Sequence, residues 1–174
     1  MALGNFGACL AITLKAEGGF VNLAADPGGA TNLGITIGTL SHYLGHTATV
    51  DDVKALTVAS VTPIYHALYW LPVQGDFLPR GVDLMTWDTG VNSGPRLGVR
   101  LLQEAVNAVA DGILGPKTLQ AVMAADPLAT IDLYATRHEA FYRSLSTFPT
   151  FGHGWLSRLH SVAQMATDMA KAPA

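Results

Sequence analysis

Apolar residues recur at helical spacing along most of the chain, and short stretches containing Gly or Pro separate the helical segments. In the first segment, Phe6 to Ala16, the spacing predicts a helix buried on one face, and Gly18-Gly19 ends it. The same pattern predicts further helices at residues 37–44, 51–56, 57–71, 82–91, 96–107, 119–124, 128–145 and 155–170. The fold class is therefore predicted to be mainly α.

A different pattern follows the first helix. The segments Phe20 to Leu23 and Leu33 to Thr36 have strand character, and the residues Asp26-Pro27-Gly28-Gly29 between them favour a turn. We therefore expect a small two-stranded β-hairpin beside the C-terminal end of the first helix.

Glu17 lies between this helix and the hairpin. A carboxylate at a helix C-terminus meets the negative end of the helix dipole, and apolar neighbours solvate it poorly. Both effects favour the protonated acid, which is the form that a general acid needs when it protonates a glycosidic oxygen. The alternative is a surface glutamate at a frayed helix end.

Asp26 and Thr31 reach the same cleft as Glu17 if the hairpin folds back over the helix end. Asp26 also has a structural alternative, because Asp before Pro-Gly is a good turn former. Two carboxylates about 6.5–9.5 Å apart leave room for a water and give inversion, whereas a separation near 5 Å suits a nucleophile and retention. We expect the wider geometry, in which Asp26 orients the water and Thr31 helps to hold it.

The string E-G-G-F-V-N from Glu17, followed by D-P-G-G-A-T-N-L-G-I-T from Asp26, resembles the opening motif of glycoside hydrolase family 108. Members of this family are peptidoglycan-cleaving N-acetylmuramidases of phages and bacteria. The resemblance implies a lysozyme-like fold, cleavage of the β-1,4 bond between N-acetylmuramic acid and N-acetylglucosamine, and Glu17 as the catalytic glutamate. The Glu, Asp, Thr order is also similar to the triad of shorter phage lysozymes, although the interval from Asp26 to Thr31 is one residue shorter here.

Four further residues are candidates for substrate binding: Asn32 in the hairpin, Tyr69 in the helix at 57–71, and Trp87 and Asn92 in the helix at 82–91 or just after it. Tyr69 is an aromatic residue that can line a sugar groove or fill the core. Asn92 lies four residues after Asp88 and shares its face. The run Asn92-Ser93-Gly94 is similar to the family pattern, and it also suits a helix C-cap.

The C-terminal half carries the pattern D-G-x-x-G-P-x-T at residues 111–118, in which Gly115 and Pro116 start a helix. This pattern resembles the signature of small helical peptidoglycan-binding modules. No flexible linker precedes it. We therefore expect a lysozyme-like catalytic lobe at residues 1–94 and a helical peptidoglycan-binding segment at residues 95–174, packed together as one body.

Charge and composition limit the classes of molecule that the protein can bind. A net charge of −3 argues against nucleic acid, and it gives no general attraction to an anionic cell wall, so binding must use a shaped groove. The stretch between Lys54 and Asp76 lacks charged residues, but Pro63, Pro72 and its polar residues argue against membrane insertion. We expect a monomer that binds peptidoglycan glycan strands.

The N-terminus lacks the basic region and cleavage pattern of a secretory signal. We expect synthesis in the cytoplasm, followed by release to the wall through a helper such as a holin or by delivery within a phage-like particle. Cys9 has no disulfide partner, so a buried structural thiol is expected.

Rival chemistries have weaker support. His42 and His46 are four residues apart, but Gly45 interrupts the helix between them, and no H-E-x-x-H motif occurs. The serine-hydrolase patterns G-x-S-x-G and S-x-x-K are also absent. We expect no metal and no cofactor. A non-catalytic wall-binding protein and a chitinase-like glycosidase on the same scaffold are the alternatives, and the presence of Glu17 favours an enzyme.

Overall fold

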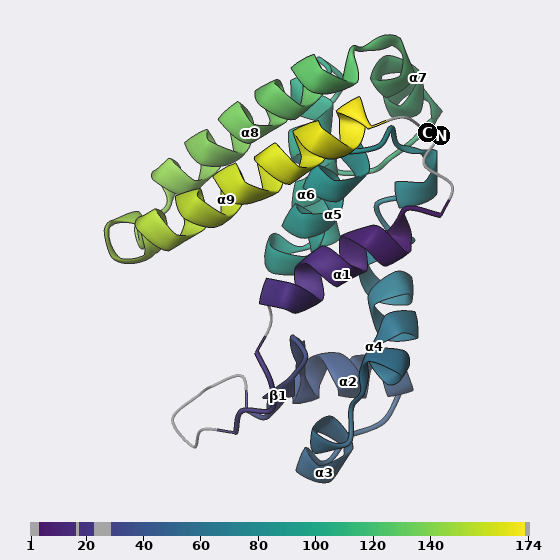
Figure 1. Ribbon diagram of the computed structural model, residues 1–174, viewed down its shortest axis with the longest axis vertical. Helices are drawn as coiled ribbons and strands as arrows, with labels where there is room; N and C mark the ends of the chain where they lie inside the picture. Colours follow the sequence, from purple (N-terminus) through teal and green to yellow (C-terminus); the bar gives the residue numbers. More distant parts are fainter. Residues whose placement is uncertain (1–3, 17, 23–28, 173–174) are drawn as a thin grey trace. The chain divides into compact units, whose positions relative to one another are not determined.

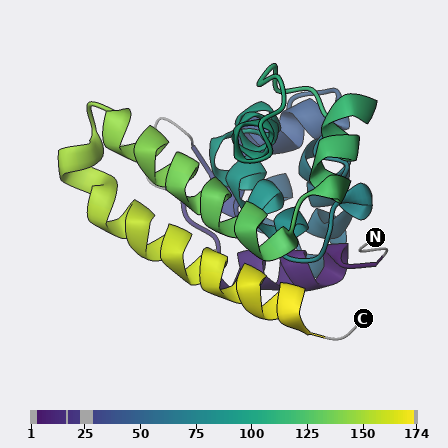
Figure 2. The same ribbon diagram turned by 90° about the horizontal axis from the view of Figure 1, so that it is seen from above.

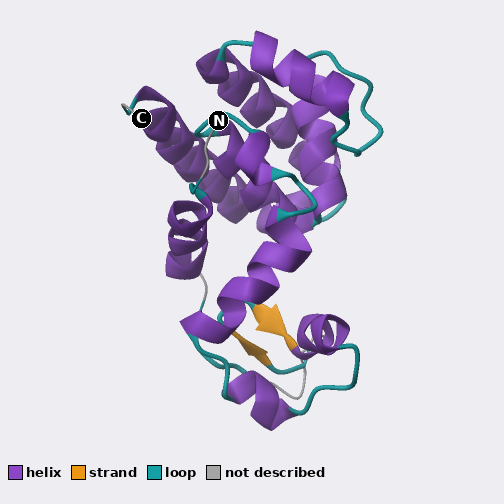
Figure 3. Cartoon of the chain, turned by 90° about the vertical axis from the view of Figure 1, so that its right-hand side faces the viewer, coloured by secondary structure: helices purple, strands orange, loops and turns teal. Residues whose placement is uncertain are grey.

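The computed structural model describes residues 4–16, 18–22 and 29–172, and within these ranges the chain is mainly helical with one small antiparallel sheet (Figures 1 and 3). Glu17 and Asp26 lie outside the described residues. Contacts divide the chain into two compact units. We call Phe6–Trp70 the hairpin unit, and the residues from Leu71 onward, together with the N-terminal residues up to Asn5, the helical unit.

The hairpin unit is built from short elements: α1 (Phe6–Ala16), β1 (Thr31–Asn32), β2 (Ile35–Thr36), α2 (Ile37–Leu44), α3 (Val50–Lys54), α4 (Val58–Tyr65) and the π-helical segment η1 (His66–Trp70). The ring of Phe6 packs against His66 and Trp70, with centroid separations of 5.0 and 5.4 Å. Trp70 is fully buried. These contacts join the start of α1 to the end of the unit.

The hairpin differs from its predicted form. Thr31 pairs with Thr36 and Asn32 with Ile35, so the two-residue turn is Leu33-Gly34, whose φ angles of 50° and 75° fit a type I′ turn. In the described part of the predicted strand at 20–23, residues 20–22, there is one bridge, in which Val21 and Thr31 exchange two backbone hydrogen bonds of 2.8 Å. Most of the predicted turn at 26–29 lies outside the described residues. Gly34 explains the difference, because it allows the chain to reverse within 31–36.

The helix boundaries also differ in places. The predicted helix at 57–71 divides into α4 and η1. The helix predicted at 51–56 is α3, which starts at Val50, and its N-cap Thr49 forms a capping box with Asp52. The predicted loop at 148–154 belongs to the last helix, which starts at Phe148 with Pro149 in its first turn.

The helical unit contains the short η2 (Gly75–Phe77), α5 (Val82–Ser93), α6 (Pro95–Ala105), α7 (Pro116–Ala124), α8 (Pro127–Ser144) and α9 (Phe148–Lys171). Helices α8 and α9 run side by side as a long antiparallel pair (Figure 2). Every residue from Val82 to Gly90 is buried, because α6, α8 and α9 all pack against α5. By contact, α5 therefore groups with the C-terminal helices, and the two compact units divide after Trp70.

The close approach of α5 and α6 depends on Gly98. A Cβ atom added there would lie 2.6 Å from the Thr86 carbonyl oxygen and 3.3 Å from the Gly90 backbone nitrogen. The Gly98 carbonyl oxygen also accepts a 3.0 Å hydrogen bond from the hydroxyl of Tyr134 on α8. A residue without a side chain thus lets three helices meet.

We predict that Gly98→Ala destabilises the protein by about 1–3 kcal/mol, because the new methyl group overlaps backbone atoms that cannot move independently. The free energy of unfolding in urea measures the effect. Gly154→Ala in α9 is the control, since nothing lies within 4 Å of its added Cβ and it is expected to stabilise the helix by about 0.5–1 kcal/mol. Equal stability of the two variants would contradict the close α5–α6 contact.

Candidate functional site

The catalytic candidates come from the part of the sequence between α1 and the hairpin, and from the hairpin itself. Glu17 follows the last residue of α1, and Asp26 lies between Val21 and Thr31 in the sequence. The structure describes neither side chain. It does show that Val21 and Thr31, the described residues on either side of Asp26, are joined by the β-bridge. The two ends of this segment are therefore held together.

Thr31 occupies the central position of this small sheet. Its backbone bonds to Val21 on one side, and it pairs with Thr36 on the other. Its side chain is half-buried, and its hydroxyl makes no hydrogen bond to another described residue. Backbone pairing thus fixes the position of Thr31, and its hydroxyl keeps its capacity to hydrogen-bond a ligand or water.

Asn32 has a structural role in the hairpin unit. Its side chain is buried, and its amide nitrogen lies 3.1 Å from the carbonyl oxygen of Val53 and 3.3 Å from those of Lys54 and Leu56. These acceptors surround the C-terminal end of α3, where helix carbonyls lack partners. Asn32, which is predicted to contact substrate, thus joins β1 to α3 in the structure.

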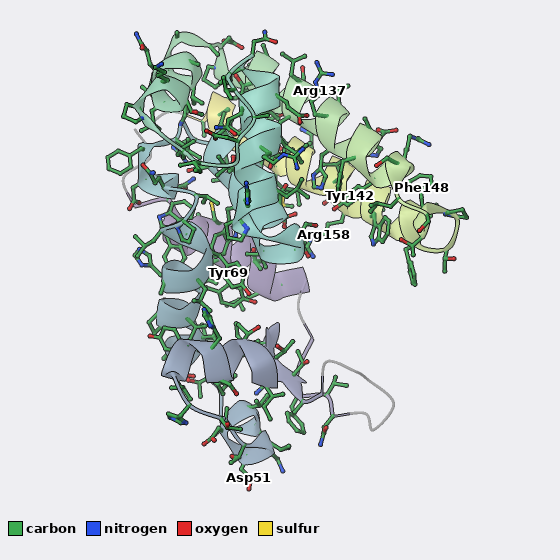
Figure 4. All side chains as sticks on the ribbon, turned by 180° about the vertical axis from the view of Figure 1, so that it is seen from behind. Asp51, Tyr69, Arg137, Tyr142, Phe148 and Arg158 are labelled. Carbon is green, nitrogen blue, oxygen red and sulfur yellow. The ribbon has the colours of Figure 1, made fainter. Side chains whose placement is uncertain are left out.

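Tyr69 lines a pocket of about 400 Å³ together with Gly38, Thr39, His42 and Leu68. It is half-buried and comes from the π-helical η1, a wide turn of the kind often found at functional sites (Figure 4). Its ring lies 5.7 Å from that of Tyr65, whose hydroxyl donates a 3.0 Å hydrogen bond to the Leu33 carbonyl oxygen. Tyr65 therefore links the pocket to the hairpin turn.

Trp87 and Asn92 belong to the helical unit. Trp87 has no exposed surface, so its ring is part of the core and does not face a groove. Asn92 is exposed, and its amide nitrogen donates a 2.7 Å hydrogen bond to the carbonyl oxygen of Asp88 one turn earlier. The predicted residues thus fall into two groups, with Thr31, Asn32 and Tyr69 in one unit and Trp87 and Asn92 in the other.

Asp88 forms an ion pair that the sequence alone does not reveal. The Arg158 guanidinium of α9 donates to both carboxylate oxygens of Asp88, at 2.7 and 3.3 Å. Arg158 and Tyr142 lie on the adjacent helices α9 and α8 (Figure 4). Burial is the main cause, and the nearby Asp88 charge a smaller one, of a Tyr142 hydroxyl pKa raised to about 12. This pair ties α5 to α9 next to Asn92.

Two other buried ionisable groups are Asp83, in the first turn of α5, and His138 on α8, which contacts Thr89 of α5. Burial raises the pKa of Asp83 to about 6, although its carboxylate accepts hydrogen bonds from Asn5 Nδ2 and from the backbone nitrogens of Gly81 and Leu84. Burial lowers the pKa of His138 to about 4, and its Nε2 has no hydrogen-bond partner among the described residues. Asp83 was missed because its only sequence signal is an acid among apolar residues at a helix start.

A search for metal ligands gives no candidate centre: within residues 4–16, 18–22 and 29–172, no three His, Cys, Asp or Glu side chains come together as a possible ion site. Of the helices that the structure describes, none has the length and apolar character needed to cross a membrane.

The mainly helical fold with one small antiparallel sheet, together with the matches that follow, defines a lysozyme-like glycoside hydrolase. The chain belongs to the glycosyl hydrolase 108 family, whose model matches residues 10–94. The structure of Brucella abortus SagA is similar at 41% identity and a TM-score of 0.89, with 97% of each chain covered. A comparison with curated proteins gives no match.

A second model, described as a predicted peptidoglycan domain, matches residues 97–160. The two models meet near residue 95, although contacts in the structure divide the chain after Trp70. Together these matches confirm the predicted family and fold class and identify the protein as a peptidoglycan hydrolase.

Proposed function

We propose that the protein is an N-acetylmuramidase that hydrolyses the β-1,4 bond between N-acetylmuramic acid and N-acetylglucosamine, with Glu17 as the general acid. The main support is the family match, which includes the segment around Glu17. The position of Glu17 directly after α1 adds a physical reason, since the negative end of a helix dipole disfavours an ionised carboxylate. An acid that stays protonated near neutral pH can protonate the departing glycosidic oxygen.

Glu17→Gln is expected to reduce the turnover of purified peptidoglycan by about 100- to 10,000-fold, because an amide cannot deliver the proton. Release of new reducing ends measures the reaction, and circular dichroism checks the fold. Glu104→Gln is the matched control, since Glu104 lies on α6 and has no place in the proposed chemistry. Near wild-type turnover by Glu17→Gln would overturn the assignment and mean that another residue is the general acid.

Asp26 and Thr31 complete the proposed reaction. Asp26 orients the attacking water and Thr31 helps to hold it, which gives an inverting mechanism. The bridge between Val21 and Thr31 supports this assignment, because it joins the two ends of the segment that contains Asp26. The Thr31 hydroxyl makes no hydrogen bond to another described residue, so it is available to bind a water.

The anomer released first from a defined β-linked muroglycan tests this mechanism. Inversion gives the α product, which NMR detects before mutarotation mixes the anomers. Initial β product would instead assign retention, with Asp26 as the nucleophile. Asp26→Asn is expected to lower turnover strongly; if both rate and stability are unchanged, Asp26 serves only the turn.

The Tyr69 pocket is the proposed site for one sugar of the glycan strand. It combines an aromatic ring with the hydroxyl of Thr39 and the imidazole of His42, and sugars bind surfaces that offer an apolar face beside polar groups. Its volume of about 400 Å³ falls within the range of small-molecule sites. Tyr65, whose ring lies 5.7 Å from that of Tyr69, donates a hydrogen bond to Leu33 in the hairpin that precedes α2.

Tyr69→Ala is expected to raise KM for a soluble muroglycan roughly tenfold, because stacking on the ring contributes about 1.4 kcal/mol. Tyr69→Phe keeps the ring and should retain most of the affinity. Tyr43→Ala provides the control, since Tyr43 is 38% exposed on α2 and does not line the pocket. Equal KM values for Tyr69→Ala and Tyr43→Ala would exclude the pocket from substrate binding.

A further inference from the structure

The loop between α6 and α7 contains the D-G-x-x-G-P-x-T pattern, and one buried side chain holds it in place. Gln103 is 1% exposed. Its amide nitrogen lies 2.8 Å from Asp111 Oδ1, 3.0 Å from the Ile113 carbonyl oxygen and 3.1 Å from the Thr118 hydroxyl. Its amide oxygen accepts a 2.8 Å hydrogen bond from the Gly112 backbone nitrogen. A satisfied buried network of this kind makes a loop rigid.

Gly112 fixes the position of the loop on α6. It has a φ of 78°, and a Cβ atom added there would lie 2.5 Å from Cγ of Arg96 and 3.2 Å from Cγ of Arg100. Hydrogen bonds from the Gln103 side chain and the Ile113 backbone nitrogen keep the pKa of Asp111 below its usual range. The loop therefore presents an ionised carboxylate in a fixed position.

Two apolar side chains of this rigid loop are exposed to solvent. Val109 is 81% exposed and Ile113 is 67% exposed, the two largest values among the exposed large hydrophobic residues that the structure describes. Ile113 and Val109 also line a pocket of about 770 Å³, which we call the loop pocket. Its other walls include Ala108, Pro116, Ala121 and Lys117. Ordered, exposed apolar residues around a concave site are typical of a binding surface.

The side chains that line the loop pocket suit the peptide of peptidoglycan better than its sugars. No aromatic side chain lines it, so it lacks the platform on which a sugar ring stacks. It offers instead small aliphatic walls, the ammonium group of Lys117 and the carboxylate of Asp111. Lys117 makes no ion pair with another described residue, so its charge is available to a ligand. A short peptide of small residues that carries free carboxylate and amino groups is complementary to these walls.

We propose that the loop pocket binds the peptide stem of peptidoglycan, with Ile113 and Val109 contacting its alanine methyl groups and Lys117 pairing with a stem carboxylate. The peptidoglycan partner comes from the family assignment, but the proposal is independent of Glu17 and of the bond that is cleaved. The hairpin unit would then contact the sugars while the helical unit contacts the peptide.

The test is titration of the full-length protein with an isolated stem peptide, followed by NMR or calorimetry. This probe contains no glycosidic bond, so catalysis does not interfere. Ile113→Ser and Lys117→Ala are each expected to weaken binding about tenfold, through loss of apolar contact and of the ion pair. Val58→Ser and Lys171→Ala are the controls, because Val58 is 55% exposed, Lys171 is also exposed, and neither lines the pocket.

A second measurement separates the peptide from the sugar. Binding of stem-free glycan strands is measured for two proteins under the same conditions: the Glu17→Gln variant and the double variant that also carries Ile113→Ser. Stem-free glycan should bind equally well to both proteins. The proposal is overturned if the stem peptide does not bind, if Ile113→Ser and Lys117→Ala bind it as the controls do, or if Ile113→Ser weakens binding of the stem-free glycan. The Glu17→Gln variant should lose turnover but bind the stem peptide as the wild type does. A failure of stem binding can therefore be distinguished from a failure of the proposed catalytic role.

Discussion

The burial of the first nine residues of α5 is the constraint on which the helical unit depends. Nine consecutive residues from Val82 to Gly90 are buried, so no side of this helix segment faces water and other helices must cover it all round. Helices α6, α8 and α9 supply that cover, and Gly98 lets α6 approach closely enough. This cover from three C-terminal helices explains why contacts group α5 with the C-terminal half.

Several polar side chains are also buried, and their hydrogen bonds fix the positions of neighbouring chain segments. The Asp83 carboxylate holds Asn5 and the start of α5, Asn32 holds the end of α3, and Gln103 holds the loop before α7. Each lies where backbone groups would otherwise lack partners. Rigid positioning of loops by buried amides and carboxylates is a physical means of presenting functional side chains on a small scaffold.

In the proposed function, the two units bind different parts of one polymer. The hairpin unit carries a pocket with an aromatic ring and polar groups, whereas the helical unit carries one with aliphatic walls and both charges. Peptidoglycan itself contains both sugar and peptide. A chain with a net charge of −3 gains little from general attraction to an anionic wall, so local complementarity of this kind has to provide the affinity.

The sequence by itself determined the helical class, most helix positions, and the family through the residues around Glu17, because periodicity, caps and motifs depend on near neighbours. Gly115-Pro116 likewise specified the start of α7. Only the tertiary structure decided that Thr31 pairs with Val21 and Thr36, that Asn32 and Trp87 are enclosed, and that Asp88 pairs with Arg158. These features join residues far apart in the chain or depend on which side of an element is covered, and local patterns carry neither kind of information.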